Sequence, residues 1–364
     1  MPSLSLRQAH DLVTETLMRC RTSRSNAEAV ACALVAAEEV GQVGHGLRRV
    51  PSYSAQALSG KVDGHASPAS HQGRPGVLTV DARNGFAYPA VDLAVDWLTA
   101  ATARQGIAVA GIVHSHHCGV AGVTVEHLAN AGLVAMMFAN TPAAIAPWGG
   151  RTALFGTNPI AFAAPRLKGR PAIVIDMSLS KVARGKIMAA GQRGEKIPEG
   201  WALDSDGQAT TDPQAALAGT MIPMGDAKGT ALALMVELLA AGLVGAHFGY
   251  EAPSFLSEDG AAPGVGQLIL AIDPSAFAGV DTTRIEDLAA ALDQQSDQNA
   301  AQRSSVALSR FDDLAQAVES EPGARLPGAR RLESRNRAAK EGITVDDSLL
   351  AQINALGRPL SVWN

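Results

Sequence analysis

The sequence predicts an α/β fold in which a domain with a mixed sheet is inserted into a helical domain made from both ends of the chain. Strand-like apolar runs alternate with helix-like segments in the middle of the chain, which is typical of α/β layers. Both ends show apolar residues at helical spacing instead. Several connections between strand-like runs are too short for a helical crossover, so some neighbouring strands must run antiparallel. We expect a helical domain from residues 1–75 and 296–364, and an α/β domain from residues 76–295.

The composition excludes several classes of function. The chain has 364 residues, of which 47% are hydrophobic, so it can bury more than one core. A net charge of −5 and the lack of a basic stretch argue against a nucleic-acid partner. The apolar run 231–246 is interrupted by Glu237 and is shorter than the ~20 residues that cross a bilayer, so no membrane partner is expected. Without a signal pattern or CxxC spacing, a cytoplasmic protein without a disulfide framework is expected.

The N-terminal region predicts two amphipathic helices. Apolar residues at helical spacing follow Ser5, which is placed to cap the first helix. Ser25 or Asn26 is expected to cap the second helix, which ends at Gly41. Residues 61–75 are rich in Gly, Pro, Ser and His and are expected to form a surface connection.

The middle of the chain predicts strands interleaved with helices. An alternating run at residues 76–83 indicates a strand, and residues 90–104 indicate a helix with Val91, Val95 and Leu98 facing inward. Further strands are expected at 107–113, 134–139, 161–164, 172–175 and 268–272, and further helices at 122–131 and 227–245.

The C-terminal region becomes polar and helical again. Helices are expected at residues 283–293, 311–319 and 347–356. The Gln-, Ser- and Asn-rich segment 294–305 is expected to be a loop, and residues 325–331 a second interruption.

Several common catalytic motifs are missing from the sequence. There is no GxGxxG between a strand and a helix, no GxxxxGK[ST], no HExxH and no GxSxG. A Rossmann nucleotide fold and a P-loop are therefore not supported. His114, His116 and His117 could bind a metal in principle, but no carboxylate lies at a suitable spacing, so no metal site is expected.

The segment GHGLRR at residues 44–49 has the side chains that 2-hydroxy-acid chemistry needs. Gly44 and Gly46 flank His45, so the backbone can approach a ligand closely and the imidazole can project into a cleft. Arg49 follows four residues later. A guanidinium group can bind the carboxylate of a 2-oxo or 2-hydroxy acid while the imidazole handles the proton at C2. The alternative is a loop histidine beside solvated arginines, which the spacing alone favours.

Two further segments are candidates for anion binding. In HSHHCGVAG, Gly119 and Gly122 open a helix at the end of a strand, where free N–H groups and the helix dipole suit a phosphate or carboxylate. The alternative is a tight turn with surface histidines. Lys228 precedes a long helix and could meet a phosphate, although a solvated lysine is the default expectation.

Taken together, these blocks resemble the type-2 malate/L-lactate dehydrogenase family, which includes sulfolactate and ureidoglycolate dehydrogenases and Δ1-piperideine-2-carboxylate reductases. The resemblance spans residues 5 to 357. It implies transfer of hydride, with NAD or NADP, at C2 of a small 2-hydroxy or 2-oxo acid, and a non-Rossmann fold whose α/β domain binds NAD(P). It also implies a homodimer. The matching blocks are GHGLRRVPSY, HSHHCGVAG, PWGG…FGTNPIAFAAP, IDMSLSKVARGKI, GDAKGTAL, GQLILAIDP and RLPGARR.

The resemblance also implies roles for individual residues. His45 matches the family's proton-donor histidine, and Arg49 matches the arginine that binds the substrate carboxylate. His117 matches a histidine at the nicotinamide, which in some members is assigned the acid/base role. The implied mechanism has hydride reaching C2 over the glycine turn 119–122 while His45, or alternatively His117, donates the proton. The remaining matches are Thr157, Asn158 and Arg184 for substrate, and Gly119, Val120, Ala121, Asp176, Met177, Ser178, Lys228, Gly229, Pro327, Gly328 and Ala329 for cofactor.

The sequence departs from the family pattern at several positions. Gly44 replaces the serine that partners the donor histidine, and Ala329 replaces an acid. Lys186 stands where the imine reductases carry an aspartate, and we place it among the catalytic residues expected for hydroxy-acid chemistry. Arg184 is expected to face the substrate and could supply a second positive group for a dicarboxylate.

Two alternative functions are considered beside hydride transfer to a 2-oxo acid. The first is reduction of a cyclic imino acid such as Δ1-piperideine-2-carboxylate or Δ1-pyrroline-2-carboxylate, against which Lys186 argues. The second is a catalytically inactive homologue that only binds a nucleotide or a partner. The retention of His45, Arg49, His117 and Lys228 argues against an inactive protein.

Overall fold

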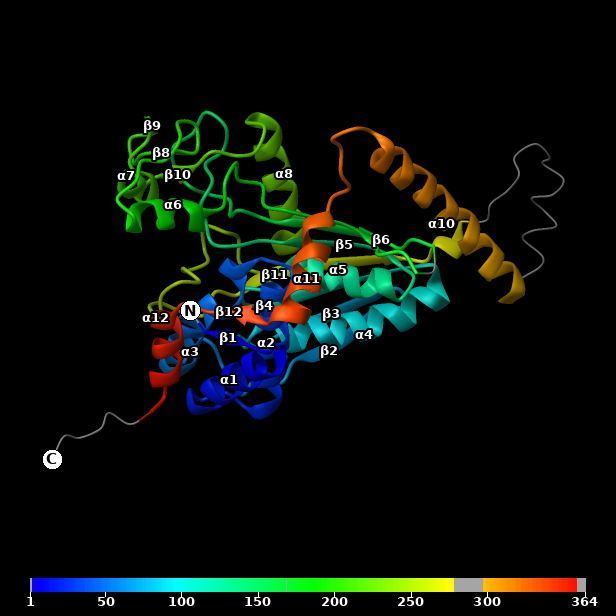
Figure 1. The fold of residues 1–364 in the computed structure, drawn as a ribbon, viewed down its shortest axis with the longest axis horizontal. Helices are drawn as coiled ribbons and strands as arrows, with labels where there is room; N and C mark the ends of the chain where they lie inside the picture. The colour runs from blue at the N-terminus through cyan, green and yellow to red at the C-terminus, as the bar shows by residue number, and fades with distance from the viewer. Residues whose placement is uncertain (1, 168, 278–296, 359–364) are drawn as a thin grey trace.

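The computed structural model describes residues 2–167, 169–277 and 297–358. It consists of a large sheet flanked by helices, a helical region at one end of the sheet and a small lobe above the helical region (Figure 1). The strands are β1 (Ser3–Leu4), β2 (Ala69–Arg74), β3 (Val77–Asp81), β4 (Ile107–Ser115), β5 (Val134–Ala139), β6 (Ile160–Ala164), β7 (Ile173–Met177), β8 (Ala202–Leu203), β9 (Ala209–Thr210), β10 (Thr220–Met221), β11 (Val265–Ile272) and β12 (Ile343–Thr344). The helices are α1 (Leu6–Arg19), α2 (Arg24–Glu39), α3 (Val50–Ser59), α4 (Ala87–Gln105), α5 (Ala121–Asn130), α6 (Arg184–Gln192), α7 (Pro213–Ala218), α8 (Ala227–Glu237), α10 (Asp297–Ser320), α11 (Ala329–Glu341) and α12 (Asp347–Ala355).

The large sheet has seven strands in the order β2-β3-β4-β11-β5-β6-β7. Strands β3 and β4 are parallel, because α4 provides the crossover between them, and the other neighbouring pairs are antiparallel. The prediction of an α/β fold with a mixed sheet is therefore confirmed. All the strands predicted from alternating apolar residues are present.

The two faces of this sheet bury different helices. Alternate residues of β5 point to opposite faces, so that Ala135 and Met137 join the core under α4 and α5, while Phe138 joins the core under α8. The π-helical turn η3 (Leu238–Gly242) continues α8 along the second face. Among the described residues, no helix has the length and apolar character needed to span a bilayer.

The two ends of the chain share one apolar core. Strand β1 pairs with β12, and residues of α1 and α2 pack with Ile343 and Ile353 from the C-terminal region. Ser5 caps α1 as predicted, with reciprocal hydrogen bonds to Gln8. The exact domain boundaries at 75/76 and 295/296 stay a prediction.

Four local expectations need correction or fall outside the described residues. Ser23, and not Ser25 or Asn26, caps α2, because its side chain accepts from the backbone N–H of Asn26. Part of the expected connection 61–75 forms the polar edge strand β2. The expected loop 294–305 is helical from Asp297 onward, where α10 begins. The predicted helix 283–293 lies outside the described residues.

Helix α11 and the small lobe were not predicted, and neither were helix α3 and the paired strands β1 and β12. Helix α11 has few apolar residues, and only Arg331 and Ala338 are buried, so it lacks the periodicity that indicates a helix. The small lobe contains β8, β9, β10, α6 and α7 around its own core of short apolar segments, including Ile145, Ile187 and Met221. The lobe lies to the upper left of the large sheet in the view of Figure 1.

A buried ion pair joins α10 to the large sheet. Arg166, which follows β6, donates from Nε to Asp312 Oδ1 of α10 at 2.5 Å, and both side chains are nearly inaccessible. Because a buried guanidinium group without its carboxylate is costly, this contact is sensitive to loss of one partner.

We predict that Asp312→Ala lowers the free energy of unfolding by about 3 kcal/mol, because the buried Arg166 charge loses its buried partner and keeps only the half-exposed Glu319. Asp313→Ala is the matched control on the same helix, since Asp313 pairs with Arg310 at the surface and should cost no more than about 1 kcal/mol. Urea denaturation of both variants measures the difference. Equal midpoints would contradict a structural role for the Arg166 pair.

Candidate active site

The candidate site lies at the end of β4, where two short 3-10 turns from the helical region meet the sheet. These turns, Val43–His45 and Leu47–Arg49, are separated by Gly46. The Leu47 N–H donates to Glu38 Oε1 at 2.8 Å, and a Cβ at position 46 would lie 2.2 Å from the same oxygen. A side chain at position 46 would push Glu38 out of this hydrogen bond, so Gly46 helps to set the course of the chain that carries His45 and Arg49.

His45 and His117 are in direct contact. His45 Nδ1 lies 3.1 Å from His117 Nε2, and the two rings stack with centroids 5.1 Å apart and an interplanar angle of 10°. His45 comes from the helical region and His117 from the segment after β4. Both catalytic histidines expected from the sequence therefore lie in one place.

Both imidazoles are electrically neutral near pH 7. Burial, and secondarily the Arg49 charge, lowers the pKa of His45 to about 4. Burial also holds the pKa of His117 well below its ordinary value, with further contributions from Arg49, His45 and His116. Each ring consequently carries one N–H, which makes the choice of protonated nitrogen important.

Arg49 is half-buried beside His45. Its Nε donates to the Gly44 carbonyl at 2.9 Å, which fixes the plane of the guanidinium group. Its two terminal nitrogens make no hydrogen bond within the described part of the chain. They form the planar fork that binds a carboxylate in two parallel hydrogen bonds.

The three crowded histidines have separate surroundings. His114 is exposed, has a φ of 48° and contacts Asp81 Oδ1 at 2.9 Å. His116 is buried, with Nε2 2.8 Å from Gln56 Oε1, and burial lowers its pKa to about 3. Of the three, only His117 contacts His45. Among the described residues, no three His, Cys, Asp or Glu side chains form a group that could hold a metal ion.

The loop that contains Phe255 covers the histidines. Phe255 packs against the rings of His116 and His117, with centroids 5.2 and 5.4 Å apart. The Gln56 side-chain amide donates to the Phe255 carbonyl at 2.8 Å. Lys61 is also buried and holds the same loop in place. Its Nζ donates to the carbonyls of Ser254, Ser257 and Asp259 at 2.7, 2.9 and 2.7 Å.

The expected cofactor turn lies at the N-terminus of α5. Gly119 has a φ of 70°, and a Cβ on it would lie 2.9 Å from the Tyr88 hydroxyl oxygen, so glycine is required. The Val120 and Ala121 side chains are buried in apolar clusters, so only their backbone can meet a ligand. Gly122 donates its N–H to Asp176 Oδ2 at 2.9 Å. The carboxylate expected at this helix end is therefore supplied by the chain itself.

The C-terminal segment reaches the same helix end. Arg331 Nη1 lies 3.6 Å from Asp176 Oδ2, and Arg331 and Arg335 both donate to Glu126 of α5. Arg331 Nε and Nη1 are buried without a hydrogen-bond partner among the described residues. In the sequence, the only sign of this arginine cluster was the run of basic residues after the PGA turn. The comparison with the family motif stopped at that turn and did not identify them. Gly328, with a φ of 87°, packs on Val174 next to this cluster, between exposed Pro327 and half-buried Ala329.

The expected substrate turn is only partly available to a ligand. Thr157 is half-buried; its N–H donates to Thr141 Oγ1, and its carbonyl accepts from Leu179 N–H at 2.8 Å. Ser178 Oγ lies 3.4 Å from the same carbonyl, so these two predicted residues meet. Asn158 is fully buried, and its side-chain amide donates to Ala233 O and Glu237 Oε1. Its side chain therefore holds the turn, and contact with a substrate, which stays a prediction, would have to come from its backbone.

The remaining predicted residues surround the site without touching the histidine pair. Arg184 donates to the Leu217 carbonyl at 3.0 Å in the small lobe, while Lys186 and Lys228 are exposed in the first turns of α6 and α8. Gly229 is buried where a Cβ would lie 2.1 Å from the Met224 carbonyl, and Met177 is exposed. No hydrogen bond or ion pair within the described residues joins any of these side chains to His45, Arg49 or His117.

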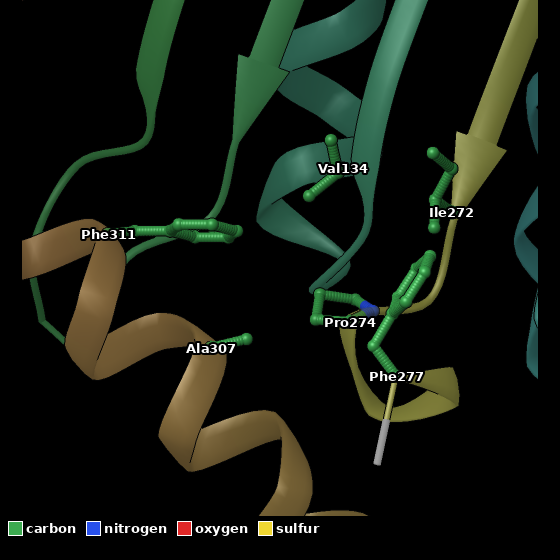
Figure 2. Close-up of a pocket in the computed structure, with 6 residues that line it drawn as sticks. All are labelled: Val134, Ile272, Pro274, Phe277, Ala307 and Phe311. Atoms are coloured by element: carbon green, nitrogen blue, oxygen red, sulfur yellow. The ribbon is translucent and has the colours of Figure 1, made fainter. Parts of the chain in front are cut away.

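An apolar pocket of about 310 Å³ lies away from this site, between α10 and the sheet (Figure 2). It sits beside Ile272, which pairs with the first residue of β4, whereas His116 follows the last residue of that strand. The pocket is therefore at the opposite end of the sheet from the histidines. Its lining consists of Val134, Ile272, Pro274, Phe277, Ala307 and Phe311.

Comparison with known proteins gives one consistent result. Residues 4–354 match the model of the malate/L-lactate dehydrogenase family. The chain is 47% identical to (2R)-3-sulfolactate dehydrogenase (NADP(+)) of Chromohalobacter salexigens, over 97% of each chain. It is 39% identical to Δ1-pyrroline-2-carboxylate reductase of Ancylobacter novellus, again over 97% of each.

Solved structures agree with the sequence matches. The Δ1-piperideine-2-carboxylate reductase of Pseudomonas syringae superimposes with a TM-score of 0.85 at 35% identity, covering 98% of this chain and 100% of that one. The sulfolactate dehydrogenase of Methanocaldococcus jannaschii superimposes with a TM-score of 0.82 at 27% identity, covering 98% of both.

Burial of neutral His116 predicts that the protein loses stability in acid. Its folded pKa of about 3 lies below the unfolded value of 6.5, so the unfolded state binds more protons as the pH falls. The contribution of neutral His116 to the free energy of unfolding is complete above about pH 6.5 and is lost toward pH 3. Over that range the free energy of unfolding falls by up to about 1.4 kcal/mol per pH unit. His116→Phe, which suits the surrounding aromatic rings, should show a shallower pH dependence of unfolding than the wild type. Parallel curves would contradict a buried neutral His116.

Proposed function

The chain belongs to the malate/L-lactate dehydrogenase family, and on that premise we propose that it is an NAD(P)-dependent oxidoreductase that transfers hydride at C2 of a small 2-hydroxy or 2-oxo acid. The observation that carries the proposal is the contact between His45 and His117 beside Arg49. It puts a proton-carrying group and a carboxylate-binding group next to each other, which is what this reaction needs at C2 and C1.

Arg49 binds the substrate carboxylate in this mechanism. Its Nε is already bonded to the Gly44 carbonyl, so the two terminal nitrogens supply the fork. His45 Nδ1 is bonded to His117, which leaves Nε2 for the oxygen at C2. His45 gives a proton to that oxygen in reduction and takes it back in oxidation. Such positioned proton transfer contributes about 10²–10⁴-fold to the rate.

The residues at the start of α5 suit a dinucleotide. The bound nicotinamide supplies or accepts the hydride. The two nitrogens of Arg331 that make no hydrogen bond within the described residues, Nε and Nη1, are groups that bind phosphate or ribose oxygens. We propose that the turn Gly119–Val120–Ala121, the strand end Asp176–Met177–Ser178, the Lys228–Gly229 pair and the Pro327–Gly328–Ala329 loop hold the cofactor. Since one relative is named for NADP(+), NADPH is the first cofactor to test.

The substrate is expected to carry a second anionic group. The relative at 47% identity is a sulfolactate dehydrogenase, whose substrate name denotes a 2-hydroxy acid with a sulfonate. Arg184 and Lys186, both in the first turn of α6, are cationic residues that could meet that group, with Thr157 on the substrate side. Burial lowers the pKa of Arg184, as expected of a cation withdrawn from water.

Reduction of a cyclic imino acid is the second candidate function. It is favoured by the relative at 39% identity, a Δ1-pyrroline-2-carboxylate reductase, and by the piperideine-2-carboxylate reductase structure. Lys186 argues against it, because a lysine cannot replace the aspartate that the imine reductases carry there. The two functions share the hydride chemistry and differ in the atom attached to C2.

We also propose that the protein is a cytoplasmic homodimer. Exposed leucines on α8, on η3 and just after η3 support the dimer, since Leu234, Leu238 and Leu243 are 46%, 56% and 69% exposed. Light scattering should give twice the chain mass of 37.5 kDa, and Leu238→Lys should shift the mass toward that of a single chain. A wild-type protein with the mass of one chain would contradict the dimer.

We predict that the protein oxidises NADPH, or NADH, in the presence of a 2-oxo acid with a second anionic group. Absorbance of the reduced nicotinamide, followed with 3-sulfopyruvate, oxaloacetate, pyruvate and Δ1-pyrroline-2-carboxylate, ranks the two candidate functions. The imine as the best substrate would establish the second candidate, and no turnover with any compound would overturn both.

His45→Ala should reduce turnover by about 10²–10⁴-fold with little change in cofactor affinity, because it removes the acid and not the nucleotide site. Fluorescence titration with the reduced cofactor provides the binding control. Turnover close to the wild-type value would move the acid role to His117.

A further inference from the structure

Tyr53 is a buried residue of α3 that the mechanism above does not use. Its hydroxyl oxygen lies 2.5 Å from His117 Nδ1 and 3.0 Å from the hydroxyl of Tyr88, which comes from α4. With the His45–His117 contact, these bonds form one continuous line of four side chains from three separate regions of the chain. We call the line Tyr88, Tyr53, His117 and His45 the Tyr–His chain.

We propose that Tyr53 is a positioning residue that orients the protons of the Tyr–His chain and supplies the proton that His45 delivers to the substrate. The inference rests on the proposed function for its chemical step, but the proton positions exist in the free protein. Tyr53 contacts neither substrate nor cofactor in this proposal and acts only through His117 and His45.

Hydrogen-bond satisfaction sets the direction of the chain. Within the described residues, the hydroxyl of Tyr88 has a single hydrogen-bond partner, the hydroxyl of Tyr53. A buried O–H without an acceptor is costly, so Tyr88 must donate to Tyr53. Tyr53 in turn donates to His117 Nδ1. If the bonds ran the other way, the proton of Tyr88 would have no acceptor in this part of the molecule.

The remaining protons follow from this direction. His117 is neutral and accepts at Nδ1, so its proton is on Nε2, where it is donated to His45 Nδ1. His45 is neutral and accepts at Nδ1, so its own proton is on Nε2. That nitrogen has no hydrogen-bond partner among the described side chains. The free enzyme therefore presents an N–H donor to the C2 oxygen without carrying a charge.

The proton transfer balances along the chain. As the substrate oxygen gains negative charge, the proton on His45 Nε2 moves to it, the proton on His117 Nε2 moves to His45 Nδ1, and the Tyr53 proton moves to His117 Nδ1. Three N–H or O–H bonds break and three form, leaving a Tyr53 phenolate that accepts hydrogen bonds from Tyr88 and His117. Oxidation of the hydroxy acid runs the same steps in reverse.

The electrostatic surroundings keep the resting Tyr–His chain uncharged. The ionisable groups outside the chain that act on it are Arg49 on the second 3-10 turn and His116 and Cys118 after β4. Lys61 after α3 acts on His116. His116, with a pKa of about 3, and Cys118, with a pKa of about 12, do not titrate between pH 5 and 9. Because burial keeps His45 largely unprotonated, an imidazolium donor is scarce near neutral pH, while burial keeps the Tyr53 hydroxyl protonated.

The pH dependence of reduction in Tyr53→Phe is the kinetic test. The wild-type single-turnover rate should be nearly constant from pH 5.5 to 8.5. In Tyr53→Phe the only remaining donor is the His45 imidazolium, so the rate should be lower and should fall about tenfold per pH unit over this range. Tyr250→Phe removes the same atom from an exposed tyrosine and should behave as the wild type. A Tyr53→Phe profile parallel to the wild-type profile would overturn the proposal.

A spectroscopic measurement on the unmodified protein keeps the test independent of folding and of activity. The ring ¹⁵N shifts of His45 and His117, assigned with His45→Gln and His117→Gln, report which nitrogen carries the proton. Both rings should be Nε2–H tautomers in the cofactor-free wild type. An Nδ1–H tautomer at His117 would overturn the proposed direction even if the enzyme is active. The expected tautomers in a protein that turns over no tested substrate would support the direction and contradict the proposed function.

Discussion

The contact between His45 and His117 is the interaction on which the site depends. It is a bond between two neutral rings, which is worth little by itself, and it is maintained because several other contacts place the rings. Gly46 lets the chain pass close to Glu38, so that His45 reaches the end of β4. The large sheet and the helical region therefore have to be joined correctly before either histidine can function.

Burial makes this contact chemically useful. The aromatic rings of Tyr53 and Phe255 exclude water from His117, and exclusion of water is the main cause of the lowered histidine pKa values. Arg49 adds a positive charge that also disfavours protonation of His45. The same Arg49 is the carboxylate-binding group in the proposed mechanism. In that mechanism one side chain binds the substrate and also helps burial to keep the acid neutral in its absence.

Much of the fold could be predicted from the sequence, because alternating apolar residues reveal strands whose faces are buried. The elements that were not predicted have one cause in common: each is stabilised by residues far away in the sequence. Helix α11 has almost no apolar face and is held by ion pairs between its arginines and Glu126, about 200 residues earlier. Strand β2 is mostly exposed and polar, and only pairing with β3 identifies it.

The same limit applies to the site. His45, Arg49 and His117 stood out because each lies in a short segment with glycines or other polar groups nearby. Tyr53 did not, because a tyrosine in a helix usually indicates core packing, and its partner His117 is 64 residues away. Asn158 was assigned to the substrate because local sequence does not show that its side chain turns inward to Glu237.

A crystal structure with oxidised cofactor and a bound 2-oxo acid tests the central claim most directly. The account predicts that the substrate carboxylate bonds to both terminal nitrogens of Arg49, with the C2 oxygen about 2.6–3.2 Å from His45 Nε2. A C2 oxygen bonded to Lys186, with Arg49 making no contact to the carboxylate, would contradict it.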